Sequence, residues 1–197
     1  MMANQTLKRS LQEIEAMKDQ IRIKDLVQIA RQDPQHQDSY VHIRRFLIEH
    51  PWTTIEDIFK ETQTMDVRTL MQMYDSYDAF ENLAIHDGVF WQCPYCRGIL
   101  SWVNNVPRCA KPSVCGEMYH DYKGRTEIHP NKGILRLRWG LHTRVCIPGQ
   151  TEIILFDWLI AQKERTDVIA EVSLWPGGDA YDIRIMFRDN EVWAIDL

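Results

Sequence analysis

Two short apolar runs, Asp182–Phe187 (DIRIMF) and Val192–Leu197 (VWAIDL), flank a polar stretch and decide the fold of the C-terminal part of the chain. Runs of this length, rich in branched and aromatic residues and bounded by turn residues, predict two strands of a hairpin. Each run carries one acid, Asp182 or Asp196, with thirteen residues between them. Adjacent strands can bring two such carboxylates onto one divalent ion, and magnesium prefers one or two carboxylates with water and phosphate oxygens.

A helix expected upstream of this hairpin offers a third carboxylate to the same ion. Pro148-Gly149 is followed by helical apolar spacing over 150–162, with Glu152 in the first turn. A strand is expected over 168–174, between this helix and the hairpin. Acids are also common in the solvated turns of hairpins, so an ordinary surface role is the alternative for Asp182 and Asp196.

Four of the five cysteines are clustered in the sequence, whereas Cys146 stands apart. Cys93 and Cys96 are separated by Pro-Tyr, and Cys109 and Cys115 supply a second pair after twelve further residues. Zinc takes four soft ligands in a tetrahedron, and a β-hairpin with one pair at each end can provide them. The pattern is similar to a zinc ribbon and predicts structural zinc with no open position for catalysis.

Three alternatives to this ligand set stay open. Five residues separate Cys109 from Cys115 where zinc ribbons usually have two, so His120 could replace Cys115 as a ligand. Cys-Pro-Tyr-Cys is also the active-site tetrapeptide of glutaredoxins, where the first cysteine lies at a helix N-terminus. The thiols could also form a core without metal. A β-like run follows Cys96 and no strand-helix-strand context surrounds it, so the sequence favours zinc.

The first part of the chain predicts helices. Apolar residues recur every three to four positions over 6–32, and shorter helices are expected over 38–49, 54–61 and 66–83. The last two could form a helix-turn-helix, but the second carries Arg68 as its only basic residue, against four acids. DNA readout needs cationic and amide side chains. We therefore expect a structural domain or one that docks a protein partner.

The most basic stretch of the chain lies between residues 132 and 144. It contains Lys132, Arg136, Arg138 and Arg144, and Arg136 and Arg138 would share one face of a strand. Two interpretations are open for these cations. They could be the solvated face of a strand, or they could form a surface that contacts nucleic-acid phosphates.

Composition limits the class of protein. The chain has 197 residues and a net charge of −5, so any contact with DNA must come through a local patch. No apolar run approaches the roughly 20 residues that a membrane helix needs, and no signal-peptide core is present at the N-terminus. We therefore expect a cytoplasmic protein without a membrane partner.

Short motifs follow one another between residues 125 and 197 in the order of a known superfamily. They are Gly133-x2-Arg136, Pro148-Gly149-x2-Glu152, Leu174-Trp175-Pro176, Asp179-x2-Asp182 and Trp193-Ala194-Ile195-Asp196. The stretch resembles the restriction-endonuclease-like, or PD-(D/E)xK, superfamily. More narrowly, it is similar to nuclease-like proteins encoded beside Piwi-related proteins and helicases in prokaryotic defence operons.

The resemblance implies DNA as substrate, catalytic Mg²⁺, and Glu152, Asp182 and Asp196 as the acidic set. In the superfamily a lysine stands two positions after the last acid, and that position falls one residue past Leu197. We therefore expect a DNA endonuclease if the chain is a fragment of a longer protein. If the chain ends naturally at Leu197, we expect a subunit without catalysis.

The predicted fold is α+β, with a helical domain over 1–86, a zinc ribbon over 87–124 and a partial restriction-endonuclease-like domain over 125–197. Two functions follow from it. The first is a metal-dependent DNA endonuclease in defence against foreign DNA, or an inactive homologue. The second is a zinc-stabilised adaptor without catalysis, which docks a nuclease, helicase or transcription partner.

Overall fold

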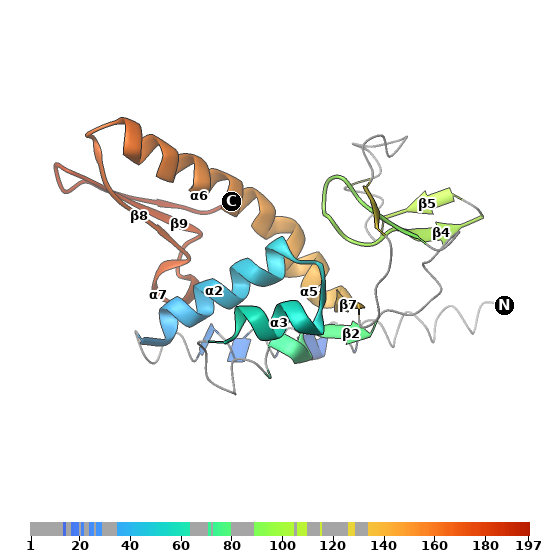
Figure 1. Cartoon of the computed structure of the whole chain (residues 1–197). Helices are drawn as coiled ribbons and strands as arrows, with labels where there is room; N and C mark the ends of the chain where they lie inside the picture. Colours follow the sequence, from blue (N-terminus) through green and yellow to red (C-terminus); the bar gives the residue numbers. More distant parts are fainter. Residues whose placement is uncertain are drawn as a thin grey trace. The chain divides into compact units, whose positions relative to one another are not determined.

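A computed structural model describes most of the chain (Figure 1). The described residues are 14, 17–19, 21, 24–25, 27–28, 35–63, 71, 73–79, 89–104, 106–109, 115, 126–128 and 134–197. The chain forms two compact units, one of residues 1–46 with 147–197 and the other of residues 47–146. Helices and small antiparallel sheets occur together, which confirms the predicted α+β class.

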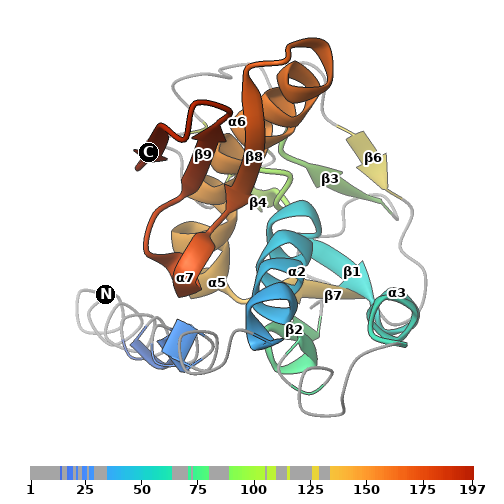
Figure 2. The same ribbon diagram turned by 90° about the vertical axis from the view of Figure 1, so that its left-hand side faces the viewer.

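The first unit contains a three-stranded antiparallel sheet of β8 (Ile169–Leu174), β9 (Ile183–Phe187) and β10 (Val192–Ile195), in the order β10-β9-β8. Helix α6 (Ile147–Arg165) lies along β8 (Figure 2). The predicted strand over 168–174 and the predicted hairpin are therefore confirmed.

Alternation along the strands explains the packing of this sheet. Val172, Leu174, Ile183 and Ile185 are buried, while the residues between them are half-buried or exposed. Removing such side chains from water supplies about 1.5–3 kcal/mol each. The sheet therefore has one apolar face, which α6 covers.

Helix α6 begins three residues earlier than the sequence predicts, at Ile147. Residues 142–146 directly before it are π-helical, so Pro148 lies inside a continuous helical stretch. The earlier start leaves Glu152 within the second turn, where its side chain is buried.

A tight turn at α7 (Pro176–Asp179) joins β8 to β9. Trp175, Gly177, Gly178 and Asp179 all have positive φ, a conformation that costs a non-glycine residue about 1–2 kcal/mol. Helix α2 (Gln35–Glu49) holds this turn. The Gln37 amide donates to the Trp175 carbonyl at 2.7 Å and accepts from the Gly178 N–H at 2.7 Å.

The second unit contains a three-stranded antiparallel sheet in the order β1-β7-β2. Its strands are β1 (Trp52–Thr54), β2 (Tyr77–Ala79) and β7 (Ile134–Leu137). Helix α3 (Ile55–Glu61) follows β1, and Thr54 caps it by accepting the Asp57 N–H at 3.1 Å. After β7 come α5 (Trp139–Leu141) and a π-helical segment, η3 (His142–Cys146).

Two small antiparallel pairs carry the cysteine segment within the second unit. β3 (Phe90–Gln92) pairs with β6 (Thr126–Ile128), and β4 (Ser101–Val103) pairs with β5 (Val106–Arg108). These pairs match the β-rich character that the sequence predicts for this region. The domain boundaries at 87 and 125 stay a prediction.

The prediction of a helix over 66–83 is wrong in its second half. Helix is found at residues 71 and 73–75, but Tyr77–Ala79 form β2. Strand β2 pairs with β7, and the buried Tyr77 donates its hydroxyl to the His50 carbonyl at 2.7 Å. These long-range contacts override the local helical spacing.

Candidate functional site

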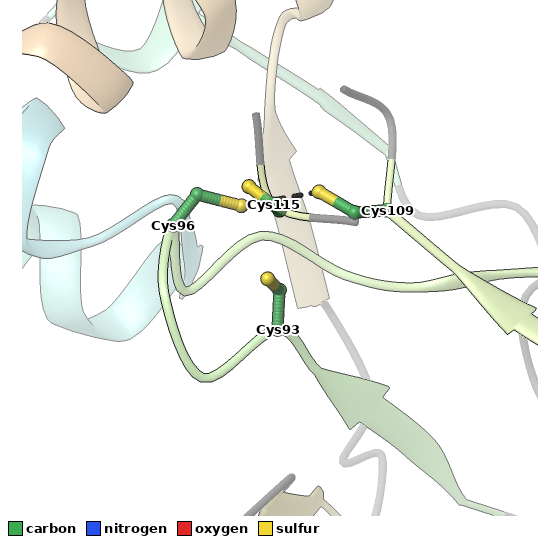
Figure 3. Close-up of side chains that lie close together, drawn as sticks. All are labelled: Cys93, Cys96, Cys109 and Cys115. Carbon is green, nitrogen blue, oxygen red and sulfur yellow. Dashed lines mark hydrogen bonds between the residues drawn. The ribbon is translucent and has the colours of Figure 1, made fainter. Parts of the chain in front are cut away.

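The four clustered cysteines meet at one point in the second unit (Figure 3). Cys93, Cys96, Cys109 and Cys115 are all buried, and their sulfur atoms lie within 4.8 Å of one another. Their donor set, four soft thiolates at one centre, fits a tetrahedral metal ion such as zinc. The predicted grouping of these four cysteines is confirmed. His120, the alternative ligand, lies outside the described residues.

A tight turn after β3 presents Cys93 and Cys96. The Cys93 N–H donates to the Gly98 carbonyl at 2.8 Å, the Arg97 N–H donates to the Cys93 carbonyl at 3.0 Å, and Arg97 has positive φ. Because the Cys-Pro-Tyr-Cys segment lies in this turn and not at the start of a helix, its thiols lack the helix dipole that activates redox cysteines.

The ring of His142, from η3, packs on this turn. A Cβ atom at Gly98 would lie 2.5 Å from His142 Cε1, so only glycine leaves room for the ring. His142 Nε2 lies 3.4 Å from the Cys96 carbonyl oxygen. Gly98 therefore allows η3 to approach the cysteine centre closely.

Crowding gives the thiols very different proton affinities. The pKa of Cys93 is lowered to about 2, because the thiols of Cys109 and Cys96 donate hydrogen bonds to it. The corresponding contacts with Cys109 and Cys93 raise the pKa of Cys96, and burial raises that of Cys115. Four neighbouring thiolates repel one another unless a cation joins them, whereas a bound metal ion deprotonates its thiol ligands outright.

The two acids of the C-terminal hairpin lie at the same end of it. Ile183 is paired with Ile195, and the Asp182 N–H donates to the Ile195 carbonyl at 3.1 Å. Asp182 precedes β9 and Asp196 follows β10, so the two residues stand opposite each other on neighbouring strands. The Leu197 N–H donates to Asp182 Oδ2 at 2.7 Å.

Glu152 extends from α6 and is held by protein groups. Its Oε2 lies 2.9 Å from Arg44 Nη2 and accepts a hydrogen bond from the Trp175 indole N–H. Arg44 also pairs with Asp179 and lies 4.3 Å from the centre of the Trp175 ring. We call Arg44, Glu152, Trp175 and Asp179 the arginine-centred cluster.

Several charged and polar groups of the arginine-centred cluster act on the pKa of Glu152. Burial raises the pKa of Glu152, while Arg44 and the Trp175 indole oppose the rise and Asp182 and Asp179 add to it. The charge of Asp182 therefore acts on the Glu152 carboxyl group. Within the described part of the chain, however, only the four cysteines form a group of three or more side chains close enough to share a metal ion.

The basic residues are dispersed over several elements. Arg136 is exposed on β7, and Arg144 is exposed in η3. Arg138 follows the end of β7, and its Nη1 lies 3.5 Å from Asp78 Oδ1. Strand β7 ends at Leu137, one residue before Arg138, so the expectation that Arg136 and Arg138 share a strand face stays a prediction. Lys132 lies outside the described residues.

The described helices include none that is both long enough and apolar enough to cross a membrane.

Comparison with known proteins gives one result. A family model described as "REase associating with pPIWI_RE" matches residues 149–197, about a quarter of the chain. The matched segment contains most of α6, the whole β8-β9-β10 sheet and all three predicted acids. No curated protein and no solved structure matches the chain.

Sequence reasoning missed Arg44 and Trp175 as partners of Glu152, and it missed Gln37 as the residue that holds the turn at Trp175 and Gly178. Arg44 is 108 positions from Glu152, and Gln37 is 138 positions from Trp175. No local spacing connects residues so far apart. The one available signal was the Trp-Pro-Gly-Gly sequence, which indicates a tight turn next to Asp179.

Proposed function

We propose that the chain is a restriction-endonuclease-like subunit that acts on DNA with a pPIWI-RE protein in prokaryotic defence. The observation that carries the proposal is the matched segment at residues 149–197. It folds as a helix followed by an antiparallel sheet, with Asp182 and Asp196 at one end of the hairpin. This arrangement agrees with the sequence resemblance to the PD-(D/E)xK superfamily.

Asp182 and Asp196 are the residues that would hold Mg²⁺ in this proposal. Two carboxylates on neighbouring strands fit an ion that takes its remaining ligands from water and phosphate oxygens. When bound, the ion would polarise the scissile phosphate and lower the pKa of the attacking water. Glu152 is engaged by Arg44 and Trp175, so we assign it the role of anchoring the turn that leads to Asp182.

The cysteine centre has a separate role in the proposal. We infer that Cys93, Cys96, Cys109 and Cys115 hold one structural zinc ion, because four protein thiolates leave no ligand position for water. The antiparallel pairs around them have only three residues in each strand, so the metal would supply much of the folding energy there.

Plasmid cleavage tests the proposed activity. The full-length protein, alone and with its pPIWI-RE protein, would be incubated with supercoiled plasmid and MgCl₂. We expect nicked or linear product, and its loss in Asp182→Ala. Asp167→Ala is the matched control, because Asp167 is highly exposed and pairs with Arg188, at the opposite end of β9 from Asp182. Cleavage that persists in Asp182→Ala would refute the assignment of the site.

The adaptor function is the second candidate, and the arginine-centred cluster favours it. Arg44 pairs with both Glu152 and Asp179, so the buried Glu152 carboxylate already has a cationic partner from the protein. An adaptor would bind its protein partner with equal affinity in wild type and Asp182→Ala, and neither would cleave DNA. Calorimetric titration of the pPIWI-RE protein into both proteins measures this binding, and cleavage by the wild-type protein is the result that separates the nuclease from the adaptor.

A further inference from the structure

Three carbonyl groups in the turn that presents Cys93 and Cys96 accept hydrogen bonds from the turn itself or from β3. The Arg97 N–H donates to the Cys93 carbonyl at 3.0 Å, and the Cys93 N–H donates to the Gly98 carbonyl at 2.8 Å. The Gln92 amide donates to the Arg97 carbonyl at 2.8 Å. The Cys96 carbonyl instead faces a side chain of η3 that is 46 positions further along the chain. The orientation of the backbone after Cys96 therefore depends on η3.

His142 is the better placed of two η3 side chains near this carbonyl. Its Nε2 lies 3.4 Å from the Cys96 carbonyl oxygen, whereas Cys146 Sγ lies 3.9 Å from that oxygen and closer to the Ile48 carbonyl. A carbonyl oxygen can only accept, so Nε2 is the ring nitrogen that carries the proton. Because the ring is 7% exposed, water competes little for this contact.

The contact with His142 opposes a relaxation of the turn. Arg97 has a φ of 56°, a conformation that residues with a Cβ atom rarely adopt. Rotation of the peptide group between Cys96 and Arg97 would relieve this φ, but it would also turn the Cys96 carbonyl away from His142. The hydrogen bond therefore holds the backbone next to Cys96 in the conformation that brings its thiol to the other three.

Gly98 gives the His142 ring its place on the thiol side of the turn. A Cβ atom at Gly98 would lie 2.5 Å from His142 Cε1 and 2.6 Å from Nε2, and 3.4 Å from Cys96 Sγ. The φ of Gly98 is not positive, so the backbone conformation alone does not require glycine there. The space for the ring does.

We propose that His142 is a positioning residue of the cysteine centre, which sets its affinity for the metal ion without being a ligand. The proposal rests on the structural zinc ion proposed above. Groups that hold the ligands of a metal ion in place reduce the ordering that binding requires, and the loss of one typically weakens metal affinity about 10- to 100-fold.

The zinc affinity of the full-length protein tests the proposal, measured under reducing conditions by competition with a chromophoric chelator. His142→Ala should bind zinc about 10- to 100-fold more weakly than wild type. Val145→Ala is the matched control, because Val145 is also 7% exposed in η3 but has no group that donates to a carbonyl. Equal affinity of wild type and His142→Ala, or equal losses in the two variants, would overturn the proposal. A wild type that binds no zinc would instead refute the zinc centre itself.

Restoring the affinity separates positioning from ligation and from loss of folding. Adding Arg97→Gly to His142→Ala should recover part of the lost zinc affinity, because glycine adopts positive φ readily and the turn then has no strain to relieve. No recovery would overturn the proposal, since a lost ligand or a misfolded segment cannot be replaced by a glycine in the turn.

Gly98→Ala provides a double-mutant cycle with His142→Ala. The added methyl group displaces the ring, so Gly98→Ala should weaken zinc binding in the otherwise wild-type protein and have no further effect in His142→Ala. Losses that simply add would show that the methyl group acts elsewhere than on the ring, and would count against the proposal.

Discussion

The cysteine centre and the arginine-centred cluster are two different solutions to placing charge-bearing groups in a protein interior. The cysteine centre gathers four thiols from a segment of 23 residues, and these thiols could hold a metal ion. The arginine-centred cluster gathers Arg44, Glu152 and Asp179 from distant parts of the chain, and its cation comes from the protein itself. The zinc proposal makes the first centre dependent on metal supply, whereas the second depends on tertiary packing.

The largest expected loss of stability follows a substitution at the cysteine centre. Cys96→Ser should lose the bound zinc and destabilise the second unit by more than about 3 kcal/mol, because structural zinc contributes on the order of 10 kcal/mol of binding free energy to small zinc domains. Elemental analysis and thermal unfolding would measure the two quantities.

Cys146→Ser is the matched control for that substitution. Cys146 is equally buried but outside the cluster, and its thiol donates to the Ile48 carbonyl at 3.4 Å, a bond that a serine hydroxyl can make. One equivalent of zinc should remain in this variant. Equal zinc content in Cys96→Ser and Cys146→Ser would contradict the assignment of the ligands.

The second largest loss of stability is expected for a substitution in the arginine-centred cluster. Arg44→Met leaves Glu152 buried without its cation, which costs about 3–5 kcal/mol for a buried pair. Arg45→Met is the control on the same helix, because the Arg45–Asp157 pair is largely exposed and such pairs contribute about 0–1 kcal/mol. Urea unfolding of the two variants measures the difference. Equal losses of unfolding free energy in the two variants would contradict the role of Arg44 as the cation that stabilises buried Glu152.

The two regions also differ in how far the sequence alone predicts them. The spacing of Cys93, Cys96, Cys109 and Cys115 predicts that the four thiols lie together, because two cysteine pairs at such spacing are typical of metal sites. The β9–β10 hairpin follows from its alternation and turn residues, and with it the position of Asp182 opposite Asp196. Arg44 could not be foreseen, since its contact with Glu152 exists only once α2 and α6 have packed.

The start of β2 is a second place where local sequence spacing does not predict the structure. Met71, Met73, Tyr74 and Tyr77 have helical spacing, yet the chain turns at Ser76, and Tyr77 begins a strand. Pairing with β7 decides the outcome, and β7 is more than fifty residues further along the chain. Local spacing carries no information about such a partner.

The most direct test of the central claim is Mn²⁺ binding, since Mn²⁺ is a paramagnetic substitute for Mg²⁺. The claim is that Asp182 and Asp196 form a divalent-ion site that is separate from the cysteine centre. Electron paramagnetic resonance titration should detect one bound Mn²⁺ per chain in wild type and none in Asp182→Asn, with zinc content unchanged. Equal Mn²⁺ binding by the two proteins, or no binding by wild type, would contradict the account.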